Sequence, residues 1–448
     1  MTAPAPRGRS AARERPGRPL RAAGLLVTTR HSASTLPWQC STELPTVGVV
    51  LGVNQLSGGT IFSYDPWECY ARGILSSPNM VVLGQLGRGK SALVKTYLSR
   101  QLVAGRQAFI LDPKGEYAAL ATRHGLRQLR LGGGSPHRLN PLDPPPSAFG
   151  GADDGSDAPA MVRARTAVLS ALVEDGLRRP MTAEERACLA AVTEQLPRQA
   201  LIGDAAEALL EPSALLAQSL HSSATQAAGA ARPVALALRR LLTGDLAGML
   251  DAPTTLSAAP PGTDEHDNRQ PQRSGSGLVL DLSAVHGTDA LTPVMVAAGA
   301  WLAARLAQPT PQRRLLLVDE AWAVLASAPT TRWLQQLSKL ARAHGVQLIT
   351  VVHRTSDLTA QTDDGTASNR QAQGLLADAE TRVVYAQAPG ERHATRELLG
   401  LTDSEADLVG QLPPGRALWR IGSRTAVVDH LLGPGDAQLV DTDSQMQP

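Results

Sequence analysis

Residues 80–91 read MVVLGQLGRGKS, and this stretch decides the fold of the chain. Its first four residues form a short apolar run typical of a buried strand, and the residues after 91 carry apolar side chains at helical spacing. Between the strand and the helix, residues 84–91 match the pattern GxxxxGK[ST] in the strand–loop–helix setting that the pattern requires. Such a match arises by accident in about one chain in several hundred of this length. The stretch therefore predicts a phosphate-binding P-loop, also called a Walker A motif.

The residue types in this loop explain how it would bind a nucleotide. Glycines let the loop curl so that backbone N–H groups point at phosphate oxygens, and the helix N-terminus adds its dipole. Lys90 is expected to reach the β- and γ-phosphates, and Ser91 to offer its hydroxyl to Mg²⁺. The predicted nucleotide-binding residues are Gly84, Gln85, Leu86, Gly87, Arg88, Gly89, Lys90 and Ser91.

A second strand carries the acidic residues that a hydrolysing P-loop protein needs. Residues 315–320 read LLLVDE, which places Asp319 and Glu320 at the carboxyl end of an apolar strand, where ligands bind in open α/β sheets. Asp319 is predicted to hold Mg²⁺ through water, and Glu320 to act as the general base that polarises the attacking water. This pair is the predicted Walker B site, and the alternative is an acidic pair that caps a strand.

A third strand, 347–353 (QLITVVH), is expected to lie between the P-loop strand and the Asp-Glu strand. His353 at its end is predicted to sense the γ-phosphate or the water, against the alternative of a structural histidine. Arg354 is a candidate arginine finger that acts on a neighbouring subunit, or a salt-bridged surface residue. Arg382, Arg392 and Arg416 compete for the finger role.

The order of apolar runs predicts an α/β fold with a mainly parallel sheet flanked by helices, because continuous runs such as 315–318 belong to strands buried on both faces. Strand-like runs, most of them followed by helical stretches, occupy 80–84, 107–112, 126–131, 278–282, 315–320, 347–353 and 382–387. A strand pair is expected at 46–53 and 59–64. Residues 416–421 and 426–431 flank Gly422-Ser423 and predict a hairpin that closes the sheet edge.

The remaining segments complete the predicted organisation. Residues 1–45 are expected to be a disordered Arg/Pro/Ala-rich arm, and 433–448 a disordered tail. The ATPase core is predicted in two parts, 46–145 and 278–432, separated by an all-helical insertion at 160–250 and a flexible linker at 253–277. Two loops, at 141–159 and 253–277, interrupt the alternation of strands and helices. Thr182 and Glu185 predict a capping box at the start of a helix inside the insertion.

Composition narrows the class of protein further. The net charge of +2 argues against a globally basic nucleic-acid binder and leaves local basic patches open. The aromatic content of 3% disfavours a carbohydrate-binding or base-stacking surface. Cys40, Cys69 and Cys188 form neither a disulfide framework nor a metal knuckle, which favours a reducing compartment. No apolar run reaches the length of a spanning helix and no secretory signal is recognisable, so we expect a soluble, cytoplasmic protein. Only four of the 43 basic residues are lysines, which makes each lysine a position to inspect.

Taken together, the motifs resemble those of the conjugation and type IV secretion ATPases, part of the HerA–FtsK group of RecA-like motors. The resemblance rests on PNMVVLGQLGRGKS, AFILDPKGEYAAL, RLNPLD, LLLVDEAWAVL and LARAHGVQLITVVHRTSDL in that order, and it covers about 46–432. By themselves, residues 112–117 (DPKGEY) are a turn with charged residues to which we assign no chemistry. Two features depart from the family pattern. The usual members present a Gln near the position of His353, and many carry a long N-terminal domain where this chain has about 45 residues.

The resemblance implies a hexameric, Mg²⁺-dependent ATPase on the cytoplasmic face of a membrane channel for secretion or DNA transfer. Its implied cofactors are ATP and Mg²⁺, and its implied partners are channel subunits, DNA or protein cargo and further copies of the chain. The first departure leaves sensing and coupling open, and the second predicts a truncated member or a separate docking polypeptide. Two alternatives stay open: a cytosolic HerA- or FtsK-like DNA translocase, and a nucleotide-gated assembly subunit that hydrolyses ATP weakly.

Overall fold

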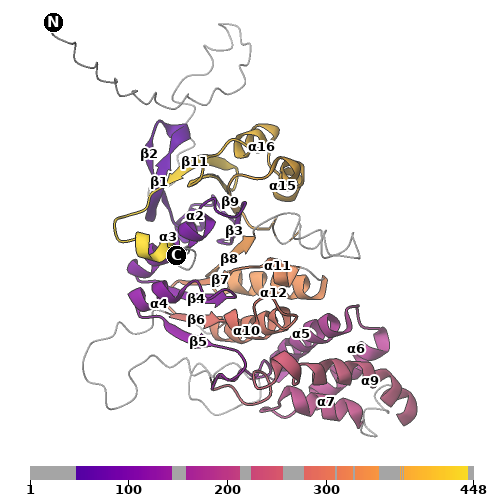
Figure 1. Cartoon of the computed structure of the whole chain (residues 1–448). Coiled ribbons are helices and arrows are strands. Elements are labelled where there is room, and N and C mark those ends of the chain that lie inside the picture. The colour runs from indigo at the N-terminus through magenta and orange to yellow at the C-terminus, as the bar shows by residue number, and fades with distance from the viewer. Residues whose placement is uncertain are drawn as a thin grey trace, which may run out of the picture. The chain divides into compact units, whose positions relative to one another are not determined.

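An eleven-stranded sheet organises the part of the chain that the structure describes (Figure 1). The structure is a computed structural model, and it describes residues 47–143, 158–211, 223–255, 277–307, 310–325, 328–352, 374, 376 and 378–441. In the order in which they lie side by side, the strands are β2 (Thr60–Tyr64), β1 (Val49–Asn54), β11 (Arg424–His430), β10 (Arg416–Ile421), β9 (Thr381–Val384), β3 (Met80–Leu83), β8 (Val346–Val352), β7 (Arg314–Val318), β4 (Gln107–Asp112), β6 (Gly277–Asp281) and β5 (Arg127–Arg130).

The sheet is mostly parallel, as the apolar runs predict. Strands β9, β3, β8, β7, β4, β6 and β5 pair in parallel, and the remaining pairs are antiparallel. The predicted placement of one strand is also confirmed, because β8 pairs with β3 on one side and with β7 on the other. The carboxyl ends of the P-loop strand and of the Asp-Glu strand therefore flank β8 at one edge of the sheet.

The predicted hairpin forms, but its predicted place in the sheet is wrong. Strands β10 and β11 pair antiparallel around Gly422, whose φ of 59° suits a tight turn. Strand β11 pairs with β1, and β1 pairs with β2 on its other side, so β2 and not the hairpin is the outermost strand at this end of the sheet. A hairpin sequence specifies the pairing of its own two strands, whereas the next neighbour depends on which apolar faces join the same core.

Two hydrophobic cores cover the two faces of the sheet, and alternate residues of one strand enter different cores. In β7, Leu315 and Leu317 belong to one core, while Leu316 and Val318 belong to the other. This division explains the continuous apolar run at 315–318, because a strand buried on both faces has no polar side.

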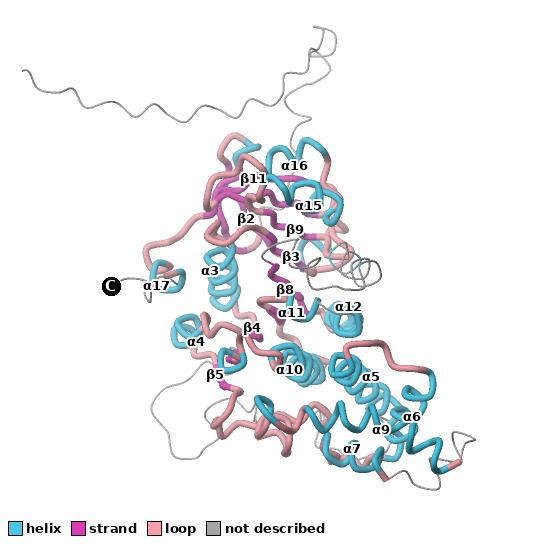
Figure 2. Tube along the Cα trace, turned by 45° about the vertical axis from the view of Figure 1, so that its right-hand side comes forward, coloured by secondary structure: helices cyan, strands magenta, loops and turns pink. Residues whose placement is uncertain are grey.

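One face of the sheet is covered by helices that follow β3 and β4. They are α3 (Lys90–Val103) and α4 (Ala118–His124), joined by the short helices α2 (Pro66–Ala71) and α17 (Ala437–Val440). The opposite face is covered by α10 (Leu291–Leu306), α11 (Trp322–Leu325), α12 (Ala328–Ala343), α15 (Arg392–Leu399) and α16 (Asp403–Val409). Figure 2 shows α3, α4 and α17 on one side of the strands and α10 and α12 on the other.

Helices dominate the segment between β5 and β6. They are α5 (Ala158–Leu177), α6 (Ala183–Gln195), α7 (Ile202–Leu210) and α9 (Ala224–Arg240), and α5 packs against α10 and α12. The capping box predicted at the start of α6 is confirmed, with Thr182 and Glu185 each bonding the other's backbone N–H. The two predicted loops are 141–159 and 253–277, and most of each, residues 144–157 and 256–276, lies outside the described residues.

Three further observations bear on the expectations from composition. Cys69 and Cys188 are buried free thiols, and Cys40 lies outside the described residues. The predicted arm at 1–45 also lies outside them. Within the described ranges, no helix combines the length and the apolar character that a membrane crossing requires.

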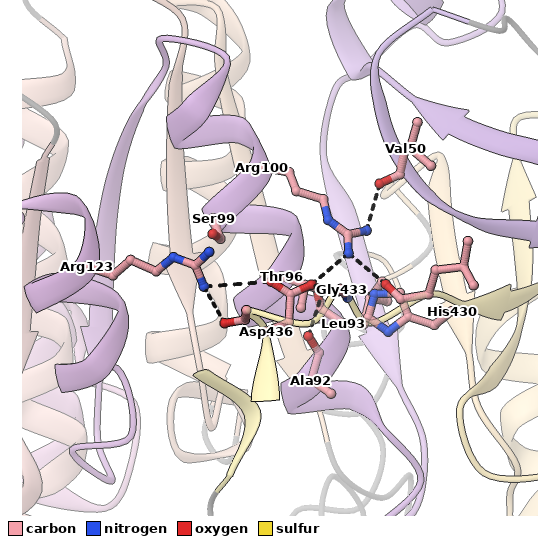
Figure 3. A network of polar contacts seen from close by, with 12 residues as sticks. Val50, Ala92, Leu93, Thr96, Ser99, Arg100, Arg123, His430, Gly433 and Asp436 are labelled. Carbon is pink, nitrogen blue, oxygen red and sulfur yellow. Dashed lines mark hydrogen bonds and ion pairs between the residues drawn. The ribbon is translucent and has the colours of Figure 1, made fainter. Parts of the chain in front are cut away.

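The prediction of a disordered tail is wrong for residues 433–441, which pack against α3 and α4 (Figure 3). Asp436 accepts a hydrogen bond from Arg100 at 2.9 Å and from the Gly433 N–H at 2.8 Å, and Leu439 is buried in the core. Arg123 donates to the Gly435 carbonyl at 2.7 Å. A polar composition predicted a solvated tail, but one buried leucine and one bound carboxylate order these residues. Residues 442–448 lie outside the described part.

The same region contains a histidine that couples stability to pH. The His430 ring shares a hydrogen bond of 2.8 Å with Thr96 of α3, and burial lowers the pKa of His430 to about 4, with Arg100 acting in the same direction. An unfolded histidine titrates near pH ~6.5. Between these values the unfolded chain binds more protons, so this contribution to stability is complete above pH ~6.5 and is lost as the pH falls toward about 4.

We expect wild-type protein to lose about 2 kcal/mol of unfolding free energy more than His430→Gln between pH ~6.5 and ~4, a figure reduced from the full pKa shift because the ring keeps some contact with solvent. Urea unfolding of both proteins across this range checks the prediction. His393→Gln, at an exposed helix position, should follow the wild-type curve. Parallel pH curves for wild type and His430→Gln would contradict the prediction.

Candidate functional site

The predicted P-loop connects the end of β3 to the start of α3, the setting that its sequence requires. Gly89 precedes the helix with a φ of 107°, which favours glycine, and no side chain caps the first turn of α3. The N–H groups of that first turn therefore have no side-chain cap to compete with a phosphate group. Lys90 is buried, and its ammonium donates to the carbonyl oxygens of Gly84 and of Gln85, the latter at 2.8 Å.

Residues directly after β9 and directly before β10 hold the P-loop in place. A Cβ atom at position 84 would lie 2.4 Å from the Cβ of Tyr385, so only glycine fits there. The Gln85 N–H donates to the Ala386 carbonyl at 3.2 Å, and the Gly415 N–H donates to the Arg88 carbonyl at 3.0 Å. Sequence reasoning missed this support, because Tyr385 and Gly415 lie about three hundred residues after the loop in the chain.

The two predicted acidic residues follow β7 directly and are both buried. One oxygen of Asp319 accepts a hydrogen bond from the Tyr117 hydroxyl at 2.9 Å, and the other accepts one from the Glu320 N–H at 2.9 Å. Burial and the Asp319 carboxylate raise the pKa of Tyr117 well above its usual value, so this hydroxyl stays a donor. The Asp319 carboxylate is therefore held in one orientation at the edge of the sheet.

Glu320 has an unusual backbone and two charged or polar partners. Its φ of 50° lies in the left-handed region, which costs a residue other than glycine about 1–2 kcal/mol and is found mostly at functional sites. One carboxylate oxygen forms an ion pair with the Lys114 ammonium, and the other accepts a hydrogen bond from the Trp322 indole N–H.

Residues 112–117, to which sequence analysis assigned no chemistry, are therefore part of the candidate site. Asp112 folds the segment, because its carboxylate accepts hydrogen bonds from the N–H groups of Gly115 at 2.9 Å, Glu116 at 3.1 Å and Tyr117 at 3.0 Å. Two features of the sequence could have pointed to this segment: it contains one of only four lysines, and it follows a predicted strand.

The segment also contacts the helix that begins at the P-loop. Lys95 of α3 is buried, lies 3.6 Å from the Glu116 carboxylate and stands 5.6 Å from the centre of the Tyr117 ring. Burial raises the pKa of Asp112 to about 6, with the nearby Asp319 and Asp281 carboxylates acting in the same direction. Three of the four lysines, Lys90, Lys95 and Lys114, thus lie in or beside the candidate site.

The other predicted residues are placed less completely. His353 follows β8 directly, and both His353 and Arg354 lie outside the described residues. Arg382 donates to the Leu399 carbonyl at 2.6 Å, and Arg416 forms an ion pair with Asp429. The Arg392 Nε atom is buried without a hydrogen-bond partner among the described residues. Both Arg382 and Arg416 are thus held by groups of their own chain.

The residues present fit a nucleotide with Mg²⁺. The described residues contain no cluster of three or more His, Cys, Asp or Glu side chains placed to hold a metal ion. Mg²⁺ in phosphate-transfer sites commonly takes one or two protein ligands together with phosphate oxygens and waters. In such a site the Ser91 hydroxyl, in the first turn of α3, and the Asp319 carboxylate, directly after β7, would be the protein ligands, and the uncapped start of α3 would receive the phosphates.

The mostly parallel sheet flanked by helices is an α/β fold of the RecA-like NTPase type. VirB4 of Thermoanaerobacter pseudethanolicus superposes with a TM-score of 0.65 at 20% identity, over 88% of this chain and 99% of that chain. The bacterial conjugative coupling protein TrwBΔN70 gives a TM-score of 0.55 at 18% identity, over 88% and 90% of the two chains. TrwB in complex with ADP and Mg²⁺ gives 0.54 at 17%, over 89% and 92%.

No protein-family model and no curated protein sequence matches the chain. At these low identities the structural likeness establishes the fold. The resemblance to conjugation and type IV secretion ATPases that the motifs predict is thereby confirmed at the level of the fold.

Proposed function

We propose that this protein is an ATP-hydrolysing motor that energises conjugative DNA transfer or type IV secretion at the cytoplasmic face of a membrane channel. The proposal rests on the positions of two motifs. The P-loop follows β3 and the Asp319–Glu320 pair follows β7, and these two strands flank β8, so both motifs lie at the carboxyl ends of the parallel strands. Phosphate binding and water activation need these groups on one edge. VirB4 and TrwB share the fold, and TrwB binds ADP and Mg²⁺.

Each site residue has a distinct task in this proposal. Lys90 leaves the loop carbonyls and binds the β- and γ-phosphates, while the N–H groups of the loop and of the first turn of α3 hold the phosphate oxygens. Ser91 and Asp319 hold Mg²⁺, Asp319 through water. When bound, Mg²⁺ neutralises part of the phosphate charge. Glu320 accepts a proton from the water whose oxygen attacks the γ-phosphorus, the bond from that phosphorus to the β,γ-bridging oxygen breaks, and ADP and phosphate leave.

The remaining parts of the proposal concern assembly and partners. We propose a homo-hexamer, in which Arg354 reaches the nucleotide of a neighbouring subunit and His353 contacts the γ-phosphate or the water. Channel subunits at the inner face of the membrane are the proposed docking partners, and DNA or protein is the proposed cargo. The conjugative role of TrwB supports this choice of partners.

Ring assembly and the response of ATP hydrolysis to channel subunits test the motor proposal. We expect mass measurement with a non-hydrolysable ATP analogue to show a hexamer, and ATP hydrolysis to rise when the chain meets its channel subunits. A chain that stays monomeric with nucleotide and with channel subunits would count against a ring motor.

Two alternatives give different results in the same experiment. A cytosolic translocase would be stimulated by duplex DNA without channel subunits, and its binding to DNA would weaken steeply with salt as counterions are released. A nucleotide-gated assembly subunit would form the ring with ATP and release almost no phosphate.

A further inference from the structure

Both oxygens of the Glu320 carboxylate already have donors, one from a distant segment and one from a residue two positions further along the chain. The Lys114 ammonium, on the segment after β4, pairs with one oxygen, and the Trp322 indole N–H bonds the other. Glu320 is buried, whereas the Lys114 side chain keeps about a third of its surface exposed, at 29%.

This arrangement opposes the task proposed for Glu320. A general base needs a lone pair directed at the water, and its carboxylate must be basic enough to accept a proton. An ammonium ion beside a carboxylate stabilises its charged form and occupies the lone pairs on that side.

The segment that carries Lys114 is fixed at both ends. Asp112 ties its backbone with three hydrogen bonds, and Tyr117 bonds the neighbouring Asp319 carboxylate. Lys114 therefore approaches Glu320 from an anchored turn, and the backbone of Glu320 is itself in the left-handed region, with a φ of 50°. Lys90 is likewise bonded to carbonyls of its own loop. Lys90, which must reach the phosphates, and Glu320, which must reach the attacking water, are thus both bonded to other groups of the chain.

We propose that Lys114 is a positioning residue that restrains Glu320 in an idle orientation, so that the chain hydrolyses ATP more slowly than Glu320 itself allows. The inference rests on the proposed ATPase function and adds a restraint that regulates its rate. Trp322 takes part in the restraint through its indole N–H. Hydrolysis then requires Glu320 to exchange these two donors for the attacking water, while nucleotide binding through Lys90 is independent of the exchange.

Lys114→Met tests the restraint, because it keeps an unbranched side chain as far as the Cε atom and removes only the ammonium. An ion pair of this exposure biases an equilibrium by about fivefold at most, so we expect kcat to rise about fivefold with KM and nucleotide affinity unchanged. Lys114→Arg retains a cation and should keep kcat below that of Lys114→Met. Lys339→Met removes a lysine from an exposed position on α12 and should leave kcat unchanged.

Two further variants make the test specific. Lys114→Met combined with Glu320→Gln should be as inactive as Glu320→Gln alone, which shows that the gain acts through Glu320. Trp322→Phe removes the second donor and should raise kcat in the same direction, and it serves as the test if Lys114→Met fails to fold.

The possible outcomes separate this inference from the proposed function. Wild-type hydrolysis with an equal or lower kcat in Lys114→Met, at intact nucleotide affinity, overturns the restraint and leaves the ATPase function standing. A silent wild type and an active Lys114→Met support both. If neither protein binds or hydrolyses ATP, the proposed function fails and the restraint fails with it.

Discussion

Lys90→Ala is expected to lose nucleotide affinity by at least about 100-fold, because hydrogen bonds from a charged group contribute about 1.5–3 kcal/mol each and Lys90 is proposed to bind two phosphates. In the structure the Lys90 ammonium is buried against loop carbonyls, so its removal also leaves those carbonyls without a donor. Titration with a fluorescent ATP analogue measures the loss.

A control separates the charge of Lys90 from its position. Lys339→Ala removes the same charge from an exposed site on α12 and should bind nucleotide like wild type. Unfolding curves of both variants show whether the loop keeps its fold. Wild-type affinity in a folded Lys90→Ala would remove Lys90 from the nucleotide site.

Glu320→Gln is expected to keep nucleotide binding and to lose turnover by about 10²–10⁴-fold, the contribution that a general base makes. The amide has nearly the shape of the carboxylate, and its single carbonyl oxygen can accept a hydrogen bond from Lys114 or from Trp322, but its NH2 group cannot accept the other and the amide cannot take a proton from water. Phosphate release under saturating ATP, beside the affinity for the fluorescent analogue, distinguishes the two effects.

Glu397→Gln provides the matched control, because Glu397 is an exposed carboxylate on α15 whose partner is His393. Its turnover should equal that of wild type. Substantial hydrolysis by Glu320→Gln would assign the role of base to another group.

The sequence predicted the local part of the site and missed the part that depends on strand order. Residues 84–91 and the pair Asp319–Glu320 are contiguous motifs, and each occupies the strand end where its sequence places it. Lys114 and Tyr117 meet that acidic pair only because β4 lies beside β7. A turn sequence such as DPKGEY gives no information on its neighbour in the sheet. Its contacts with Glu320 and Asp319 therefore appeared only in the structure.

The same distinction explains what could be predicted of the fold. Continuous apolar runs identified the buried parallel strands, since burial on both faces leaves a direct mark on composition. The prediction that the hairpin forms the outermost strands was wrong, because the placement of β1 beside β11 depends on pairing between residues far apart in the chain. The packed residues 433–441 were missed for a similar reason: their order depends on Arg100 of α3 and on one buried side chain, Leu439.

The central claim is that the P-loop and the Asp319–Glu320 pair form one site that hydrolyses ATP, and steady-state phosphate release tests it most directly. Wild type, Lys90→Ala and Glu320→Gln are compared at saturating ATP, with Mg²⁺ and with a chelator. We predict Mg²⁺-dependent release by wild type, little release by either variant, and retained ATP binding in Glu320→Gln alone. ATP binding without phosphate release in both wild type and Lys114→Met, or Lys90→Ala and Glu320→Gln variants that match the wild-type rate, would show that these residues do not form a hydrolytic site.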